Sequence, residues 1–109
     1  MPEAPHLDVL PEHLVVVRNI LKKRVPDFAV WAFGSRVIGK AKKFSDLDLA
    51  VITKKPLPLS RAAALAEEFS ESDLPYKVDI ADWASIGEAF RRVIEARHVV
   101  IQRPSRRAA

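Results

Sequence analysis

Two aspartates separated by a single residue stand at the start of a short apolar segment. In Asp46-Leu47-Asp48-Leu49 the carboxylates alternate with leucines, a pattern typical of a β-strand with one buried face. Residues two apart in an extended chain project from the same face, about 7 Å apart along the backbone. Two carboxylates in this arrangement can share divalent cations. The chain has no Cys and no clustered His, which favours Mg²⁺ or Mn²⁺ over zinc.

A third carboxylate, that of Asp79, is the only charged side chain in the later apolar segment Val78–Ala81. If this segment forms a strand beside the first one and shares its exposed face, three acidic side chains converge. Like charges at such distances repel one another unless cations neutralise them. Asp46, Asp48 and Asp79 together therefore predict a metal site.

A Gly-Ser turn precedes the aspartate pair by a fixed spacer. Gly34-Ser35 directly follows the strand-like run Phe28–Phe33, and residues 36–45 separate it from Asp46. Glycine allows the backbone to approach an oxyanion closely, and serine supplies a hydroxyl. The turn can therefore hold terminal phosphate oxygens, while cations on the aspartates bridge the remaining phosphates.

These motifs resemble those of the minimal nucleotidyltransferases (MNT proteins) of the polymerase-β superfamily, which are often encoded beside HEPN-domain proteins in toxin–antitoxin pairs. The spacing of helices and strands is similar over about residues 10–100. The matching positions are Phe33–Arg36, Gly39, Ala41, Ser45–Leu49 and Val78–Ile80.

The resemblance implies an α/β (α+β) nucleotidyltransferase fold, in which a small mixed β-sheet is flanked by helices. It implies transfer of a nucleoside monophosphate, AMP when the substrate is ATP, to an acceptor hydroxyl, with Mg²⁺ or Mn²⁺ as cofactor. The metal ligands would be Asp46 and Asp48, with Asp79 as the third carboxylate, which would orient the hydroxyl or take its proton. Gly34 and Ser35 would contact the triphosphate.

Arg36 is placed to touch the triphosphate as well, although an exposed arginine in a turn is an equally good interpretation. Family members often carry a second arginine just before the position of Gly39 and an acidic residue just after it. This chain has Ile38 and Lys40 at those places. The lysines of this loop either attract the triphosphate in place of the arginine or form a solvated basic surface.

A chain that contains a triphosphate-and-metal site and little else needs a partner that supplies the acceptor group. The resemblance therefore predicts that a HEPN-domain partner supplies the acceptor hydroxyl and is silenced by its modification. One alternative is a non-catalytic antitoxin that masks its partner sterically, through apolar residues of the last helix or around Trp83. A third interpretation is a small nucleic-acid-binding protein that uses the arginines near the C-terminus.

The hydrophobic periodicity predicts alternating strands and helices that would position these motifs. Strands are expected at 28–33, 47–52, 76–81 and, as a short edge strand, 98–102. Helices are expected at 11–24, 61–72 and about 86–97. Ser60 is the expected N-cap of the second helix, and either a capping box from Ser85 to Glu88 or Asp82 caps the third. The expected core-facing stripe of the third helix consists of Ile86, Phe90, Val93 and Ile94.

The composition is that of one ordinary globular domain of 109 residues, of which 49% are hydrophobic. Lys and Arg number 18 and Asp and Glu 14, so the net charge is +4. Residues 1–102 should form the nucleotidyltransferase domain and residues 103–109 a basic, disordered tail. Without the tail the charges nearly balance, which argues against nucleic acid as a partner. The lack of Cys, of a signal peptide and of a long apolar run predicts a cytoplasmic protein without membrane contact.

Overall fold

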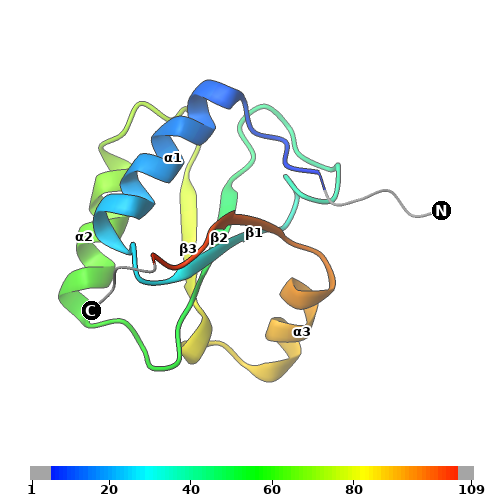
Figure 1. Ribbon diagram of the computed structural model, residues 1–109. Helices are drawn as coiled ribbons and strands as arrows, with labels where there is room; N and C mark the ends of the chain where they lie inside the picture. Colours follow the sequence, from blue (N-terminus) through cyan, green and yellow to red (C-terminus); the bar gives the residue numbers. More distant parts are fainter. Residues whose placement is uncertain (1–5, 106–109) are drawn as a thin grey trace.

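A four-stranded sheet lies at the centre of the computed structural model, which describes residues 6–105 (Figure 1). Its strands are β1 (Ala29–Phe33), β2 (Leu47–Ile52), β3 (Val78–Asp82) and β4 (Val99–Gln102). Their order in space is β3-β2-β1-β4. The central strand β1 is antiparallel to β2 and β4, whereas β2 and β3 are parallel. The predicted mixed sheet and its edge strand at 98–102 are thereby confirmed.

The helices divide between the two faces of the sheet. The helices α1 (Pro11–Arg24) and α2 (Leu59–Ser70) lie side by side over one face, blue and green in Figure 1. The shorter α3 (Glu88–Ala96), in orange, lies on the other side. A helix with an apolar stripe must bury it against a neighbouring layer, and α1 and α2 do so together. One sheet face is therefore covered by two helices, while α3 covers only part of the other.

Alternation along the strands separates a buried face from an open face. Val30 and Val51 oppose each other in the pairing of β1 with β2, as do Ala32 and Leu49, and all four are buried together with Leu47. Full burial of a Val or Leu side chain contributes about 1.5–3 kcal/mol. The apolar face under α1 and α2 therefore fixes the strands in place, and the alternate residues project from the open face.

Two predicted helix caps are wrong. The N-cap of α2 is Pro58 instead of Ser60, and the N-cap of α3 is Gly87, and neither makes a side-chain cap hydrogen bond. The serine of the expected capping box, Ser85, ends a short 3-10 helix that begins at Trp83. The box fails because the chain turns between Ser85 and the first residue of α3.

Asp82 does not cap the last helix either, because its carboxylate is hydrogen-bonded to the segment that follows β2. It accepts hydrogen bonds from the hydroxyl of Thr53 and from the amide of Leu57, the latter at 2.7 Å. Thr53 is buried, so these bonds hold the end of β3 against the segment that follows β2. Asp82 lies opposite Val51 in the parallel pairing, on the side of the sheet away from Asp79.

The predicted core-facing stripe of the last helix is largely wrong. Of its four residues only Ile94 is buried, and Phe90 and Val93 are 41% and 64% exposed. Ile86 precedes the helix and is partly buried. The helix has only nine residues, or about two and a half turns, and Ile94 is its one buried residue.

The described part of the predicted tail is not detached from the domain. The amide of Ser105 donates a 2.8 Å hydrogen bond to the carbonyl of Pro26. Residues 106–109, the remainder of the expected disordered tail, lie outside the described residues. No helix within residues 6–105 has the length and apolar character needed to cross a membrane.

Candidate active site

The register of the sheet brings two of the predicted carboxylates together. Asp48 of β2 lies directly opposite Asp79 in the parallel pairing with β3 and directly opposite Phe33 in the antiparallel pairing with β1. Directly opposed residues project from the same face of a sheet. Asp48 and Asp79 therefore share the open face, away from α1 and α2. Asp46 precedes the strand and is exposed.

The glycine of the predicted phosphate turn touches the same carboxylate. Gly34 follows the last residue of β1 and has a φ of +80°, a backbone conformation that L side chains rarely adopt. A Cβ atom built on Gly34 would overlap Oδ2 of Asp48 and would lie 3.2 Å from its Cγ. Glycine is therefore required here both by its φ and by the close approach of Asp48. The turn and the aspartate pair, ten residues apart in the sequence motif, are in direct contact.

Backbone hydrogen bonds keep the turn tightly coiled. The carbonyl of Gly34 accepts hydrogen bonds from the amides of Val37 at 2.9 Å and Ile38 at 3.2 Å, and the carbonyl of Ser35 accepts one from Lys40 at 3.1 Å. Ser35 is partly exposed beside Gly34. This single helix-like turn directly follows β1 and includes Ser35, the neighbour of Gly34.

The carboxylates form an electronegative cluster. The pKa of Asp48 is raised above its ordinary value, first by burial and then by the negative charges of Asp79 and Asp46. Burial and like charges both disfavour the ionised form of an acid. The negative charges of both other aspartates therefore act on Asp48.

The three carboxylates do not gather into a ready three-ligand metal site. Among residues 6–105, no three His, Cys, Asp or Glu side chains are close enough to hold one ion together. Asp79 instead forms an ion pair with Lys77, with Nζ 3.2 Å from Oδ1. The repulsion that raises the pKa of Asp48 also opposes closer approach of these groups without a cation. The donor set of Asp46 and Asp48 nevertheless fits a hard divalent cation, because it consists only of carboxylate oxygens.

Arg36 is buried and holds the loop between β1 and β2, contrary to the interpretation as an exposed arginine in a turn. The residue is 5% exposed. Its guanidinium donates hydrogen bonds to the carbonyls of Asp8, Lys43 and Ser45 at 2.8–3.2 Å. It also lies over the ring of Tyr76, 3.9 Å from the ring centroid. Arg36 therefore positions the loop that ends at Asp46, and its donors face backbone carbonyls.

Sequence reasoning missed two residues beside the carboxylates. Lys77 pairs with Asp79, and its spacing of two residues from Asp79 in an extended segment was a signal that both project from one face. Phe33 adjoins Asp48 on the open face and meets Phe90 of α3 at a centroid distance of 5.6 Å. That contact joins residues 57 positions apart in the sequence (90 − 33), so no local pattern indicates it.

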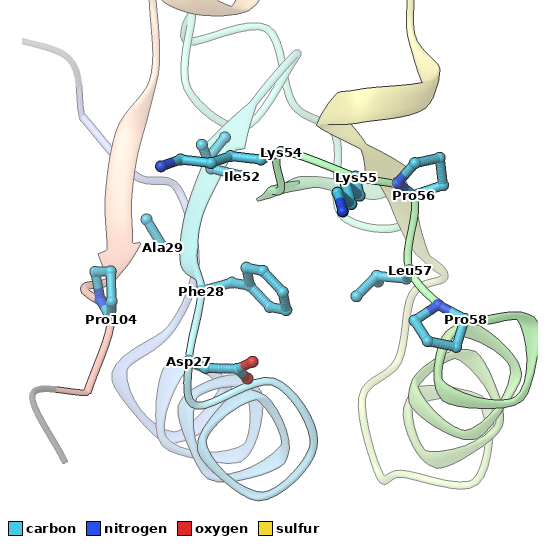
Figure 2. Close-up of a pocket in the computed structure, with 10 residues that line it drawn as sticks. All are labelled: Asp27, Phe28, Ala29, Ile52, Lys54, Lys55, Pro56, Leu57, Pro58 and Pro104. Atoms are coloured by element: carbon cyan, nitrogen blue, oxygen red, sulfur yellow. The ribbon is translucent and has the colours of Figure 1, made fainter. Parts of the chain in front are cut away.

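A separate hollow lies beyond the far end of β2. It has a volume of about 580 Å³ and a mostly apolar lining. Figure 2 shows the ring of Phe28 projecting into it, with Leu57 across the cavity and Pro104 at its side. None of its lining residues belongs to the predicted site. The carboxylates lie at the opposite end of β2, so this hollow contributes nothing to their chemistry.

Comparison with known proteins identifies the family of the chain. A family described as "Nucleotidyltransferase domain" matches residues 14–101. The chain is 54% identical over 102 residues to the "Probable protein adenylyltransferase MntA" of Haemophilus influenzae, and the match covers 94% of this chain and 90% of the relative.

Two solved structures have a similar fold. One is a toxin–antitoxin with AMP-PNP, with a TM-score of 0.70 and 23% identity over 88% of this chain and 76% of the other. The second is a tri-AMPylated Shewanella oneidensis HEPN toxin in complex with an MNT antitoxin. It has a TM-score of 0.64 and 19% identity over 84% of this chain and 71% of the other. At these identities the two structures support the fold alone. The matched family and the 54% identical relative establish that the chain belongs to the nucleotidyltransferase domain family and is a nucleotidyltransferase.

Proposed function

We propose that this protein is an adenylyltransferase that moves AMP from ATP to a hydroxyl group of a HEPN-type toxin and so acts as its antitoxin. The observation that carries the proposal is the contact between Gly34 and Asp48. A triphosphate bound along the Gly34-Ser35 turn would have its reacting phosphate next to the carboxylates. The 54% identical relative, named a probable protein adenylyltransferase, supports the choice of AMP and of a protein acceptor.

Asp46 and Asp48 are the proposed metal ligands, with Asp79 beside them. Mg²⁺, when bound, lowers the pKa of an attacking hydroxyl and neutralises charge on the departing pyrophosphate. A cation would also remove the repulsion that raises the pKa of Asp48. Mn²⁺ has the same preference for oxygen ligands and would substitute.

The reaction is an in-line displacement at the α-phosphorus of ATP. The acceptor oxygen forms a bond to this phosphorus, the bond to the pyrophosphate oxygen breaks, and AMP remains on the acceptor. Asp79 lies opposite Asp48 on the open face and would orient the hydroxyl and accept its proton. Gly34 and Ser35 would hold the phosphates that leave. Arg36 takes no part in this proposal, because its guanidinium is buried against backbone carbonyls.

A partner must supply the acceptor. Solved structures with the same fold come from toxin–antitoxin complexes, one of them with an AMPylated HEPN toxin. We therefore assign the acceptor hydroxyl to a HEPN-type partner protein. ATP is a cytoplasmic substrate, so the proposal places the reaction in the cytoplasm.

The test mixes the purified protein with its HEPN partner, ATP and Mg²⁺ and weighs both proteins by mass spectrometry. The partner should gain the mass of one or more AMP groups, and EDTA should prevent this. Asp46→Asn and Asp48→Asn should abolish transfer. Asp73→Asn is the matched control, because it removes the same charge from an exposed loop residue. Undiminished transfer by both site variants would refute the proposal.

A non-catalytic antitoxin that masks its partner gives a different outcome. A variant with Asp46, Asp48 and Asp79 all changed to Asn would then protect cells from the toxin as well as the natural chain does. The catalytic proposal predicts that this variant fails to protect. Comparing growth of cells that produce the toxin with either variant separates the two functions.

A further inference from the structure

Four aromatic side chains gather on the open face of the sheet, next to the carboxylates. Phe33 meets Phe90 edge to face at a centroid distance of 5.6 Å, and Trp31 meets Trp83 in the same way at 5.4 Å. The chain has eight Phe, Trp and Tyr residues in all (5 + 2 + 1). Half of them therefore lie in this one group, although they come from β1, the 3-10 helix and α3. We call Trp31, Phe33, Trp83 and Phe90 the aromatic wall.

Three members of the wall are partly covered by their neighbours. One face of Trp31 is stacked on His98 at 4.0 Å. Trp83 is held by Arg91, whose guanidinium lies over the ring and donates hydrogen bonds of 3.0 and 2.7 Å to the Trp83 carbonyl. Phe33 is partly buried under Phe90. Phe90, at 41% exposed, is the most exposed member of the wall.

The position of Phe90 relative to the carboxylates suits a nucleoside. Phe33 lies directly opposite Asp48, and directly opposed residues have Cβ atoms about 5 Å apart. Phe90 is the next ring after Phe33, which it contacts edge to face. A nucleotide held by its phosphates at Gly34 and Asp48 must extend its ribose and base from the α-phosphate. The side towards β3 carries Asp79, which the acceptor hydroxyl needs, so the base is directed towards β1 and α3.

We propose that the base of the bound nucleoside triphosphate stacks on the exposed ring of Phe90, which Phe33 supports from beneath. This inference rests on the proposed function, because it takes Gly34 and Asp48 as the phosphate end of the site. Stacking uses the flat face of the base, which every nucleobase has. A purine, with its larger face, gains more from this contact than a pyrimidine. Phe90 is thus a positioning residue for ATP that holds the nucleoside end of the substrate.

The experiment measures binding of two probes to the full-length protein by calorimetry in the absence of a partner. MgATP has a base, whereas magnesium tripolyphosphate has the phosphates alone. Phe90→Ala should weaken binding of MgATP about 5- to 150-fold, the usual effect of removing a stacking ring. It should leave binding of tripolyphosphate unchanged. Phe90→Tyr, which keeps the ring, should bind MgATP like the natural chain.

Val15→Ala is the control for shortening an exposed apolar side chain, because Val15 is 58% exposed on α1, across the sheet. It should change neither affinity. Equal affinity of Phe90→Ala and the natural chain for MgATP would overturn the inference, and so would equal losses for both probes. Loss of partner binding by Phe90→Ala with unchanged MgATP affinity would overturn it in favour of a protein interface. If the natural chain binds neither probe, the proposed function fails, and the inference fails with it.

Discussion

Gly34 is the residue on which the geometry of the site depends most directly. Gly34 and Gly39 both have positive φ values, +80° and +75°. A Cβ atom on Gly39 would meet nothing within 4 Å, whereas on Gly34 it would overlap the carboxylate of Asp48. Replacing Gly39 with alanine should therefore lower the free energy of unfolding by about 1–2 kcal/mol, because the new residue must adopt a left-handed backbone conformation. Alanine at Gly34 has the same conformational cost and also displaces a proposed metal ligand.

We expect Gly34→Ala to abolish nucleotide transfer while lowering the free energy of unfolding by only about 1–2 kcal/mol. The loss of stability stays small because the short side chain of Asp48 can rotate towards solvent. Gly39→Ala should lose a similar amount of stability and keep its transfer activity. Urea denaturation and the mass-spectrometric transfer assay, applied to both variants, check this. A Gly34→Ala variant with normal transfer would show that the close approach to Asp48 has no catalytic importance.

At the scale of elements, periodicity predicted the strands and helices well but not their ends. Residues 47–52 form a strand as expected because Leu47, Leu49 and Val51 repeat every second position. The cap at Ser60 was wrong because the helix already begins at Leu59, with Pro58 as its N-cap. Such ends depend on the path of the chain between layers, which no local pattern contains.

The carboxylates could be predicted from the sequence more completely than their surroundings. Asp48 and Asp79 each interrupt an apolar strand, and the parallel pairing places them side by side. Arg36 gives no such signal, because its partners are backbone carbonyls up to 28 residues away. Exposed Phe90 was assigned to the core, since an apolar stripe has the same spacing whether it is buried or left open.

The start of α2 is fastened to the segment before β1 by an ion pair. Arg61 donates hydrogen bonds to the carboxylate of Asp27 and, at 3.2 Å, to the carbonyl of Arg24. The hydrogen bond from Arg61 lowers the pKa of Asp27 below its ordinary value, against a smaller opposing effect of burial. A carboxyl whose pKa is lower in the folded state stabilises the fold when ionised. Its contribution is present above the unfolded pKa, near 3.9, and is lost as the pH falls through the lowered folded pKa.

Asp27→Asn should therefore destabilise the protein at pH 7 by about 0.5–1 kcal/mol, since the pair is about one-third exposed and screened by solvent. The difference from the natural chain should shrink below about pH 4 and vanish when Asp27 is protonated in both states. Denaturant unfolding at a series of pH values measures this. Asp73→Asn, in an exposed loop, is the control. A difference that does not change between pH 7 and pH 3 would exclude the ion pair as its cause.

At the scale of the whole molecule, ligand binding and folding are linked, because the site exists only when β1, β2 and β3 are paired. The phosphate turn follows β1, and the carboxylates lie at or just before the beginnings of β2 and β3. An unfolded chain brings none of these together. A ligand that binds only the folded state stabilises it in proportion to its occupancy.

MgATP at a concentration 100 times its dissociation constant should therefore raise the free energy of unfolding by about 2.7 kcal/mol. Asp48→Asn should abolish most of this gain, and EDTA should remove it from the natural chain. Without ligand, the Asp48→Asn variant should be no less stable than the natural chain, because it loses a charge that its neighbours repel. Thermal unfolding with and without MgATP measures all three quantities. Equal stabilisation of the variant would show that ATP binds elsewhere.

The burial of Leu47, Leu49 and Val51 fixes the register of β2 and with it the position of Asp48. Side chains along a strand alternate strictly between its two faces. A shift of β2 by one residue would therefore bury Asp48 in the apolar core and expose Leu47, Leu49 and Val51. At about 1.5–3 kcal/mol for each exposed side chain, molecules with the slipped pairing are too rare to matter. The buried apolar layer that stabilises the fold therefore also fixes the register in which Asp48 lies opposite Asp79.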